Sequence, residues 1–118
     1  MIVVHHLNNS RSQRILWLLQ ELDLEYEVKP YQRDSVTNLA PITLTLIHPL
    51  GKSPIITDGD ITVAESGAII EYLIGTYYKK GAEEHLTDPQ RGTEIHRQYT
   101  YWLHFAEGTL MPPLVAKL

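Results

Sequence analysis

Residues 54–64 read PIITDGDITVA, and this stretch decides the fold. Two short runs rich in β-branched residues, Pro54–Thr57 and Ile61–Ala64, flank the acidic turn Asp58–Asp60. Such runs around an Asp-Gly turn are a strong signal for a β-hairpin, because glycine tolerates the backbone angles that tight turns need. The sequence therefore predicts two antiparallel strands here.

The N-terminal part of the chain predicts a strand, a helix and a second strand. Ile2–His6 and Glu25–Tyr31 are the expected strands, and Arg11–Asp23 is the expected helix. Ser10 and Gln13 have capping-box spacing, so Ser10 is expected to mark the helix start. Apolar residues recur at i, i+3, i+4 and i+7 on one helix face, namely Ile15, Leu18, Leu19 and Leu22. A strand–helix–strand unit favours parallel strands.

The segments on either side of the hairpin complete the sheet. Ser35–His48 is ambiguous, because its threonines disfavour a helix while the order of elements suggests an irregular one. Ser66–Lys80 predicts a helix with an apolar stripe, and Gly81 suits a left-handed cap. These elements together predict an α/β fold: a mixed four-stranded sheet with helices on both faces.

The composition changes after this helix. Gly81–Thr87 is polar and predicts a linker. Asp88 and Pro89 suit the N-cap and first position of a further helix, which Met111–Pro113 is expected to break. The expected apolar side of this helix consists of Ile95, Tyr99, Trp102 and Ala106.

Charge and cysteine content exclude several classes of function. The formal net charge is −4 and no cluster of basic residues occurs, which argues against nucleic-acid binding. The absence of cysteine removes thiolate metal sites and any cysteine nucleophile, and it fits a reducing, cytoplasmic setting. No apolar run predicts a membrane span or a signal peptide. The histidines lack metal-ligand spacing, so no metal is expected.

Three motifs, in this order, carry a resemblance to a known family. They are HLNNSRSQR at residues 6–14, HPLGKSPII at residues 48–56 and VAESGAIIEYL at residues 63–73. With the hairpin between the last two, the chain resembles the glutathione transferases, and most closely their bacterial and fungal branch. The resemblance implies a thioredoxin-like domain over residues 1–80 (βαβαββα), a linker at 81–87, and at 88–118 the first helix and a stub of an all-helical domain.

The resemblance also implies a glutathione site. Ser66, at the start of a helix, would bind the γ-glutamyl carboxylate, and Glu65 would accept from the ligand's ammonium or support its neighbours. Ser53 would pair its main chain with the cysteinyl part of glutathione, next to a cis bond to Pro54. Lys52 would reach the glycyl carboxylate. The plainer alternatives are a helix cap at Ser66, a solvated Lys52 and a trans Pro54 that starts an edge strand.

The group that activates the thiol is the open point. The family uses tyrosine, serine or cysteine in the loop before the first helix. The serine of several classes falls here on Asn9, next to Ser10. Either residue can donate a hydrogen bond to a thiolate, and Ser10 is slightly favoured over Asn9. Arg11 and Arg14 are interpreted as structural or solvated rather than as sources of positive potential.

The expected function is conjugation of glutathione, the co-substrate, to small-molecule electrophiles. The alternatives are a non-catalytic binding or assembly module and a glutathione-dependent peroxidase. The resemblance further implies a homodimer. Neither nucleic acid nor a membrane is an expected partner.

Overall fold

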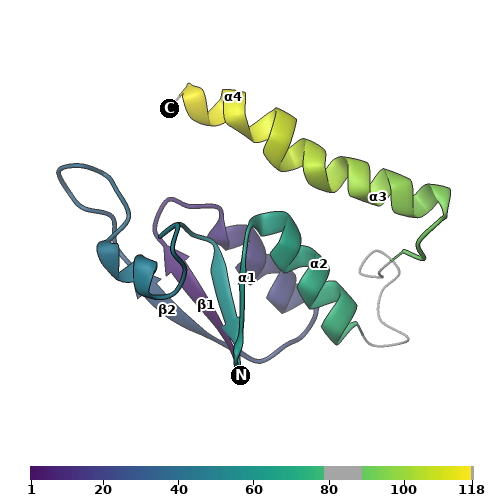
Figure 1. Cartoon of the computed structure of the whole chain (residues 1–118), viewed down its shortest axis with the longest axis horizontal. Helices are drawn as coiled ribbons and strands as arrows, with labels where there is room; N and C mark the ends of the chain where they lie inside the picture. Colours follow the sequence, from purple (N-terminus) through teal and green to yellow (C-terminus); the bar gives the residue numbers. More distant parts are fainter. Residues whose placement is uncertain (79–88, 118) are drawn as a thin grey trace.

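The computed structural model describes residues 1–78 and 89–117 (Figure 1). Its centre is a four-stranded sheet in the order β2-β1-β3-β4. The strands are β1 (Ile2–Leu7), β2 (Tyr26–Tyr31), β3 (Ile55–Asp58) and β4 (Ile61–Ala64). The mixed four-stranded sheet predicted from the sequence is therefore confirmed.

Strand pairing follows the expected directions. β1 and β2 are parallel, with Ile2 beside Tyr26. β1 and β3 are antiparallel, with Ile2 opposite Asp58. β3 and β4 form the hairpin, in which Asp58 pairs with Ile61. The Asp-Gly turn thus sets the register of the edge strand β4.

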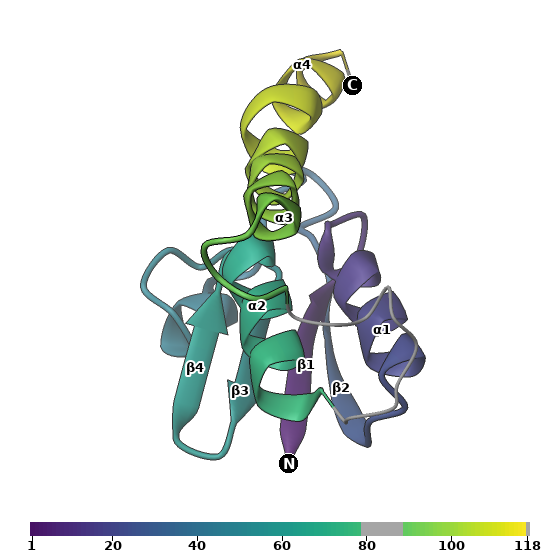
Figure 2. The ribbon, with the colours of Figure 1, turned by 90° about the vertical axis from the view of Figure 1, so that its right-hand side faces the viewer.

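Helices cover both faces of the sheet. The two helices α1 (Ser12–Glu21) and α2 (Ser66–Tyr77) lie side by side on one face (Figure 2). Their inward residues form the main core with the even-numbered residues of β1. This core includes Ile2, Val4, Ile15, Leu19, Ile56, Ile69 and Leu73. The ambiguous segment forms a short 3₁₀ helix, η1 (Ile42–Leu46), whose Leu44 packs with Leu7 and Tyr31 in a second cluster.

The predicted capping box at the start of α1 is wrong. The helix begins at Ser12, its N-cap is Arg11, and no side chain caps it. Asn9 has a φ of 52°, a left-handed angle that reverses the chain before the helix. Ser10 therefore belongs to the turn, where its Oγ accepts from the N–H of Ser12 at 3.3 Å and not from Gln13.

The predicted helix start at Asp88 and Pro89 is also wrong. Pro89 is not helical, and α3 runs from Glu94 to Phe105. Its N-cap is Thr93, whose Oγ1 accepts from the N–H of His96 at 3.2 Å. Threonine is a good N-cap, and the negative charge of Glu94 suits the positive end of the helix. The observed start therefore follows the same capping rules as the predicted one, at a later position in the sequence. Asp88, the linker at 81–87 and the Gly81 cap lie outside the described residues.

Met111–Pro113 does not break the helix as predicted. A π-helical turn, η3 (Ala106–Leu110), joins α3 to α4 (Met111–Ala116) in one continuous rod (Figure 1). Prolines lack the N–H that would bond four residues back, and they are tolerated in a first helical turn. The wider π turn accommodates the change in hydrogen bonding at this point.

The rod packs on α2 through an unexpected face. A side chain at Gly67 would meet Leu103 at 3.5 Å, so α2 and α3 approach closely there. Ile95 and Trp102, expected on the packed side, are instead exposed, and α3 has no buried residue. Within the described part of the chain, no helix is long and apolar enough to cross a membrane.

Candidate functional site

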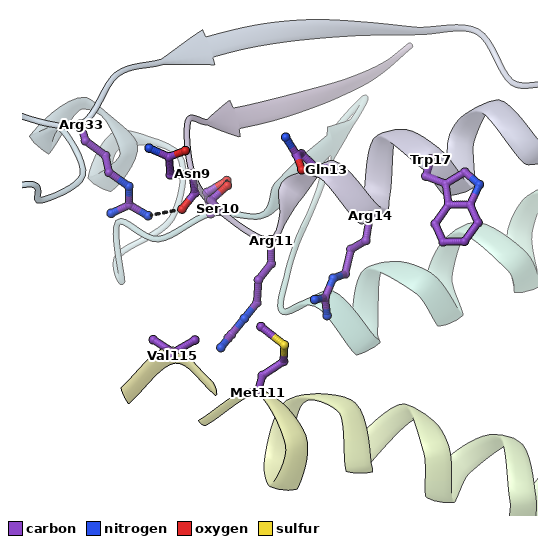
Figure 3. Close-up of a pocket in the computed structure, with 10 residues that line it drawn as sticks. Asn9, Ser10, Arg11, Gln13, Arg14, Trp17, Arg33, Met111 and Val115 are labelled. Carbon is purple, nitrogen blue, oxygen red and sulfur yellow. Dashed lines mark hydrogen bonds between the residues drawn. The ribbon is translucent and has the colours of Figure 1, made fainter. Parts of the chain in front are cut away.

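An open pocket of about 780 Å³ lies between the start of α1 and the rod (Figure 3). One side is formed by Asn9, Ser10 and Ser53, which the sequence analysis placed in one site. The opposite wall is formed by Met111 and Val115 of α4. The remaining lining residues are Arg11, Gln13, Arg14, Trp17 and Arg33.

Arg33 holds the loop that carries Asn9. Its guanidinium donates from Nε to the carbonyl of Asn8 and from Nη2 to the carbonyl of Asn9, both at 3.0 Å. Its main-chain N–H donates to Oδ1 of Asn8 at 2.8 Å. The side-chain amide of Asn9 makes no hydrogen bond to any described residue and is exposed. The loop is therefore fixed while this amide stays available.

Ser10 is held differently. Its hydroxyl donates to the carbonyl of Leu7 at 2.7 Å, and its Oγ lies 2.8 Å from Oγ of the buried Ser12. Ser12 in turn lies 2.5 Å from Nδ1 of His6. Because its proton is directed at a main-chain carbonyl, the Ser10 hydroxyl is a poor donor to an incoming ligand.

Ser53 reaches the same pocket from the other end of the sequence. Its Oγ lies 3.5 Å from Oγ of Ser10 and donates to the carbonyl of His5 at 2.9 Å. The bond from Ser53 to Pro54 is cis, as the resemblance implied. Gly51, with a φ of 59°, forms the turn before it.

His5, whose carbonyl accepts from Ser53, has both ring nitrogens in hydrogen bonds. Nδ1 lies 2.9 Å from the hydroxyl of Tyr31, and Nε2 lies 3.1 Å from Oγ1 of Thr57. Burial, with a smaller effect of the positive charge on Lys29, lowers the pKa of His5. The neutral imidazole is favoured, which suits its hydrogen bonds to the hydroxyls of Tyr31 and Thr57.

Glu65 and Ser66 start α2, close to the strand β4. Ser66 is the first helical residue and is only 4% exposed, and the N-cap position belongs to Glu65, so the plain helix-cap interpretation of Ser66 is wrong. Glu65 has a φ of 77°, an unusual angle for a residue with a side chain. It lines a second pocket of about 450 Å³, together with Gly67, Ala68, Glu71, Leu103, His104, Glu107 and Gly108.

Three of the seven predicted site residues, Lys52, Pro54 and Ser66, line neither of these pockets, and Lys52 is exposed. No group of three or more potential metal ligands occurs among the described residues.

Sequence reasoning missed Arg33, and it interpreted Arg11 and Arg14 as structural or solvated residues. Arg11 and Arg14 both form ion pairs with Glu107 of η3, and both line the pocket. No local pattern predicts this, since Glu107 lies 93 residues after Arg14. The one available signal was that two arginines lie within the motif at residues 6–14 and a third, Arg33, follows the next strand.

Comparison with known proteins identifies a family for this chain. The family model for the glutathione S-transferase N-terminal domain matches residues 1–75. Glutathione S-transferase 3 of Schizosaccharomyces pombe is 46% identical over 114 residues, which cover 95% of this chain and 43% of that protein. The chain thus spans less than half the length of this relative.

Solved structures show the same fold. A glutathione S-transferase from Actinobacillus pleuropneumoniae is 40% identical, with a TM-score of 0.84 over 98% of this chain and 52% of the other. A glutathione transferase homologue from Lodderomyces elongisporus, solved with two glutathione molecules per subunit, is 26% identical, with a TM-score of 0.69 over 88% of this chain and 49% of the other. The match of the N-terminal domain model over residues 1–75, together with these relatives, shows that the chain belongs to the glutathione S-transferase family.

Proposed function

We propose that the pocket beside Asn9 and Ser53 binds glutathione and activates its thiol for attack on small electrophiles. The observation that best supports this is the meeting of the loop before α1 with the turn before Pro54. Oγ of Ser10 and Oγ of Ser53 lie 3.5 Å apart although 43 residues separate them in sequence. A tripeptide placed across this junction reaches both segments. The related Lodderomyces elongisporus structure, which contains glutathione, is consistent with such a ligand.

The ligand's three parts have separate partners in this proposal. Its cysteinyl main chain pairs with Ser53, as an added strand does. Its γ-glutamyl carboxylate binds at the start of α2, where free N–H groups at Ser66 favour an anion and Glu65 faces the ammonium. Its glycyl carboxylate binds Lys52, which is exposed and free to swing.

Asn9, rather than Ser10, is the proposed donor to the sulfur. The Ser10 hydroxyl donates to Leu7, whereas the Asn9 amide has no partner among the described residues. A free thiol has a pKa near 8.5, and lowering it by about two units requires roughly 2.7 kcal/mol of preference for the thiolate. One amide donor, the positive end of α1 and nearby guanidinium groups together stabilise the thiolate by an amount of this order.

The reaction needs no group from the protein to form a covalent bond. The thiol proton passes to water, and the thiolate forms a carbon–sulfur bond with the electrophile. In a substitution the leaving group departs with the electron pair of the broken bond. The protein contributes proximity and stabilisation of the anion.

Four variants test the proposal. Asn9→Ala is expected to raise the pKa of bound glutathione, read from thiolate ultraviolet absorbance against pH, and to lower turnover of a chromogenic electrophile about tenfold or more. Ser10→Ala is expected to change thiolate absorbance less. Gln90→Ala is the control, since Gln90 also carries an amide and is exposed but does not line the pocket. Lys52→Gln is expected to weaken glutathione binding without shifting the thiol pKa. An unchanged pKa in Asn9→Ala would reject the role of Asn9.

A non-catalytic glutathione-binding or assembly module is the second candidate. The outward face of α3 favours it, because Trp102 is 58% exposed and contacts the rings of Tyr101 and Phe105. An aromatic surface of this kind is typical of a protein contact. Saturable glutathione binding in calorimetry without turnover of any electrophile or hydroperoxide would favour this module.

We also propose a two-fold homodimer. Apolar side chains around η1 support it, since Ile42 and Leu46 are more than four-fifths and Val36 about nine-tenths exposed. Leu46→Glu is expected to shift sedimentation from dimer to monomer. A monomeric parent chain would contradict the proposal.

A further inference from the structure

The pocket has a strongly positive wall in a chain whose net charge is negative. Arg11, Arg14 and Arg33 line it, and no aspartate or glutamate is among its described lining residues. The chain as a whole has a formal net charge of −4. Three of the ten lysine and arginine residues of the chain therefore line this one pocket, without a carboxylate among the described lining residues.

Arg33 keeps its charge unpaired. Its guanidinium donates to the main-chain carbonyls of Asn8, Asn9 and Asn38, and it contacts no carboxylate in the described structure. A guanidinium has five N–H groups, so three of these bonds leave two free. Neutral carbonyls orient the group without cancelling its charge.

Arg11 and Arg14 share a single carboxylate. Nη1 of Arg11 lies 2.9 Å from Oε2 of Glu107, and Nη1 of Arg14 pairs with Oε1 of the same residue. Two guanidinium groups of the pocket thus share one carboxylate, and the third, on Arg33, contacts none in the described structure. Glu107 also shows that the pair of arginines can hold a carboxylate in a bridging geometry.

Apolar groups line the rest of the pocket. Trp17 is 69% exposed, and Met111 and Val115 lie on the opposite side (Figure 3). In Figure 3, Arg11 and Arg14 extend from α1 toward Met111. A ligand that fills this space meets cationic groups and apolar surfaces together.

We propose that this pocket takes an anionic co-substrate, with a carboxylate on an aromatic or other apolar body. The carboxylate faces Arg33 and Arg11, and the apolar body lies against Trp17 and Met111. This inference rests on the proposed function, in which glutathione occupies the side formed by Ser53. In that proposal the two carboxylates of glutathione bind at the start of α2 and at Lys52. Its thiolate alone does not neutralise the positive charge of the arginines.

Fluorescence of Trp17 gives a direct test in the absence of glutathione. Trp102→Phe removes the second of the two tryptophans, so that the remaining signal comes from the pocket. Para-nitrobenzoate and its methyl ester, which quench tryptophan, are the probes because they share one body and differ in charge. The anion is expected to bind about fivefold tighter than the ester at low salt. The difference is expected to shrink as salt screens the charges.

Two substitutions in this background are expected to act in opposite directions. Glu107→Gln frees both arginines, so anion affinity rises about threefold, a gain that misfolding does not produce. Arg11→Gln lowers anion affinity by a similar factor. Both leave the ester affinity unchanged. Arg91→Gln, which removes an exposed charge outside the pocket, is the matched control and leaves both affinities as they are.

The outcomes separate this inference from the proposed function. Equal affinity for the acid and the ester, or an anion affinity that Glu107→Gln does not raise, would overturn the anionic specificity. Calorimetry with glutathione on the same preparations tests the proposed function by itself. Glutathione binding without anion preference rejects only the specificity, whereas anion preference without glutathione binding rejects the co-substrate role.

Discussion

The side chain of Arg33 holds the main chain of Asn9. Nη2 of Arg33 donates to the Asn9 carbonyl at 3.0 Å, across 24 residues of sequence. This bond ties the end of β2 to the loop before α1. Since Asn9 has left-handed backbone angles, the bond fixes the one residue of the loop whose conformation is least favourable.

Arg33→Lys is expected to weaken glutathione binding although it retains the charge. Lysine cannot reproduce the planar fork that contacts Asn8 and Asn9 together, so the loop gains freedom that the ligand must remove. We expect a loss of about threefold to tenfold in calorimetric affinity, the equivalent of one or two hydrogen bonds. Arg97→Lys, on the exposed side of α3, is the control. An affinity equal to that of the parent in Arg33→Lys would show that only the charge matters.

Local patterns predicted most of the sheet, because the signals for a hairpin or an amphipathic helix lie within about ten residues of sequence. β4 was predicted to the residue, and β3 to within one residue at each end. The start of α3 was wrong because Asp88 and Thr93 are both acceptable N-caps, and local rules do not rank them. The cis bond before Pro54 followed from the family resemblance alone.

The positive side of the site could not be predicted in the same way. Arg14 meets Glu107 across 93 residues, and Arg33 meets Asn9 across 24. These contacts depend on where η3 and the end of β2 pack, which no spacing within one element records. Asn9, Ser10 and Ser53 line one pocket, and they could be grouped beforehand because the family motifs carry long-range information.

Gly51→Ala is expected to be markedly destabilising. Gly51 has a φ of 59°, and a Cβ there would lie 2.7 Å from Cγ2 of Thr45. Thr45 is held by the bond from its Oγ1 to the carbonyl of Ile42, so it does not turn away freely. Strain and overlap together predict a loss of about 2–3 kcal/mol in urea unfolding.

Gly59→Ala separates the two causes of that loss. Gly59 has the same φ of 59°, but nothing lies within 4 Å of an added Cβ. The Gly59→Ala variant is expected to lose about 1 kcal/mol in the free energy of unfolding, from backbone strain alone. Gly59→Asn is expected to lose less, because asparagine tolerates this region. Equal losses for alanine at both glycines would show that the contact with Thr45 is irrelevant.

Asp58 and Tyr77 predict opposite effects of acid and alkali on stability. Hydrogen bonds donated by Tyr77 and Tyr72 lower the pKa of Asp58 below its ordinary value of 3.8. A lowered carboxyl pKa stabilises the fold above that value, and the contribution is lost as pH falls through the folded pKa. The bond to Asp58 and burial raise the pKa of Tyr77 to about 12. This contribution is complete below the ordinary pKa of 10.0 and is lost as pH rises toward about 12.

Thermal unfolding across pH checks both directions. Asp58→Asn is expected to lower the melting temperature at neutral pH, and the difference from the parent should narrow in acid. Tyr77→Phe is expected to lower the free energy of unfolding by about 1 kcal/mol at neutral pH. The difference in melting temperature between this variant and the parent should narrow in alkali. A difference that stays constant from acid to alkali would contradict both assignments.

Ser12→Ala is expected to affect stability and the site together. Ser12 is fully buried, and its Oγ lies 2.5 Å from Nδ1 of His6 and 2.8 Å from Oγ of Ser10. Alanine removes one hydrogen-bond partner from each of these two atoms. We therefore expect a loss of about 1–3 kcal/mol in the free energy of unfolding, measured with urea. Because Ser10 lies in the loop that carries Asn9, glutathione affinity at a temperature where the variant is folded should also fall. Ser35→Ala, at an exposed serine, is the control, and a Ser12→Ala variant as stable as this control would show that the hydroxyl does not hold the loop.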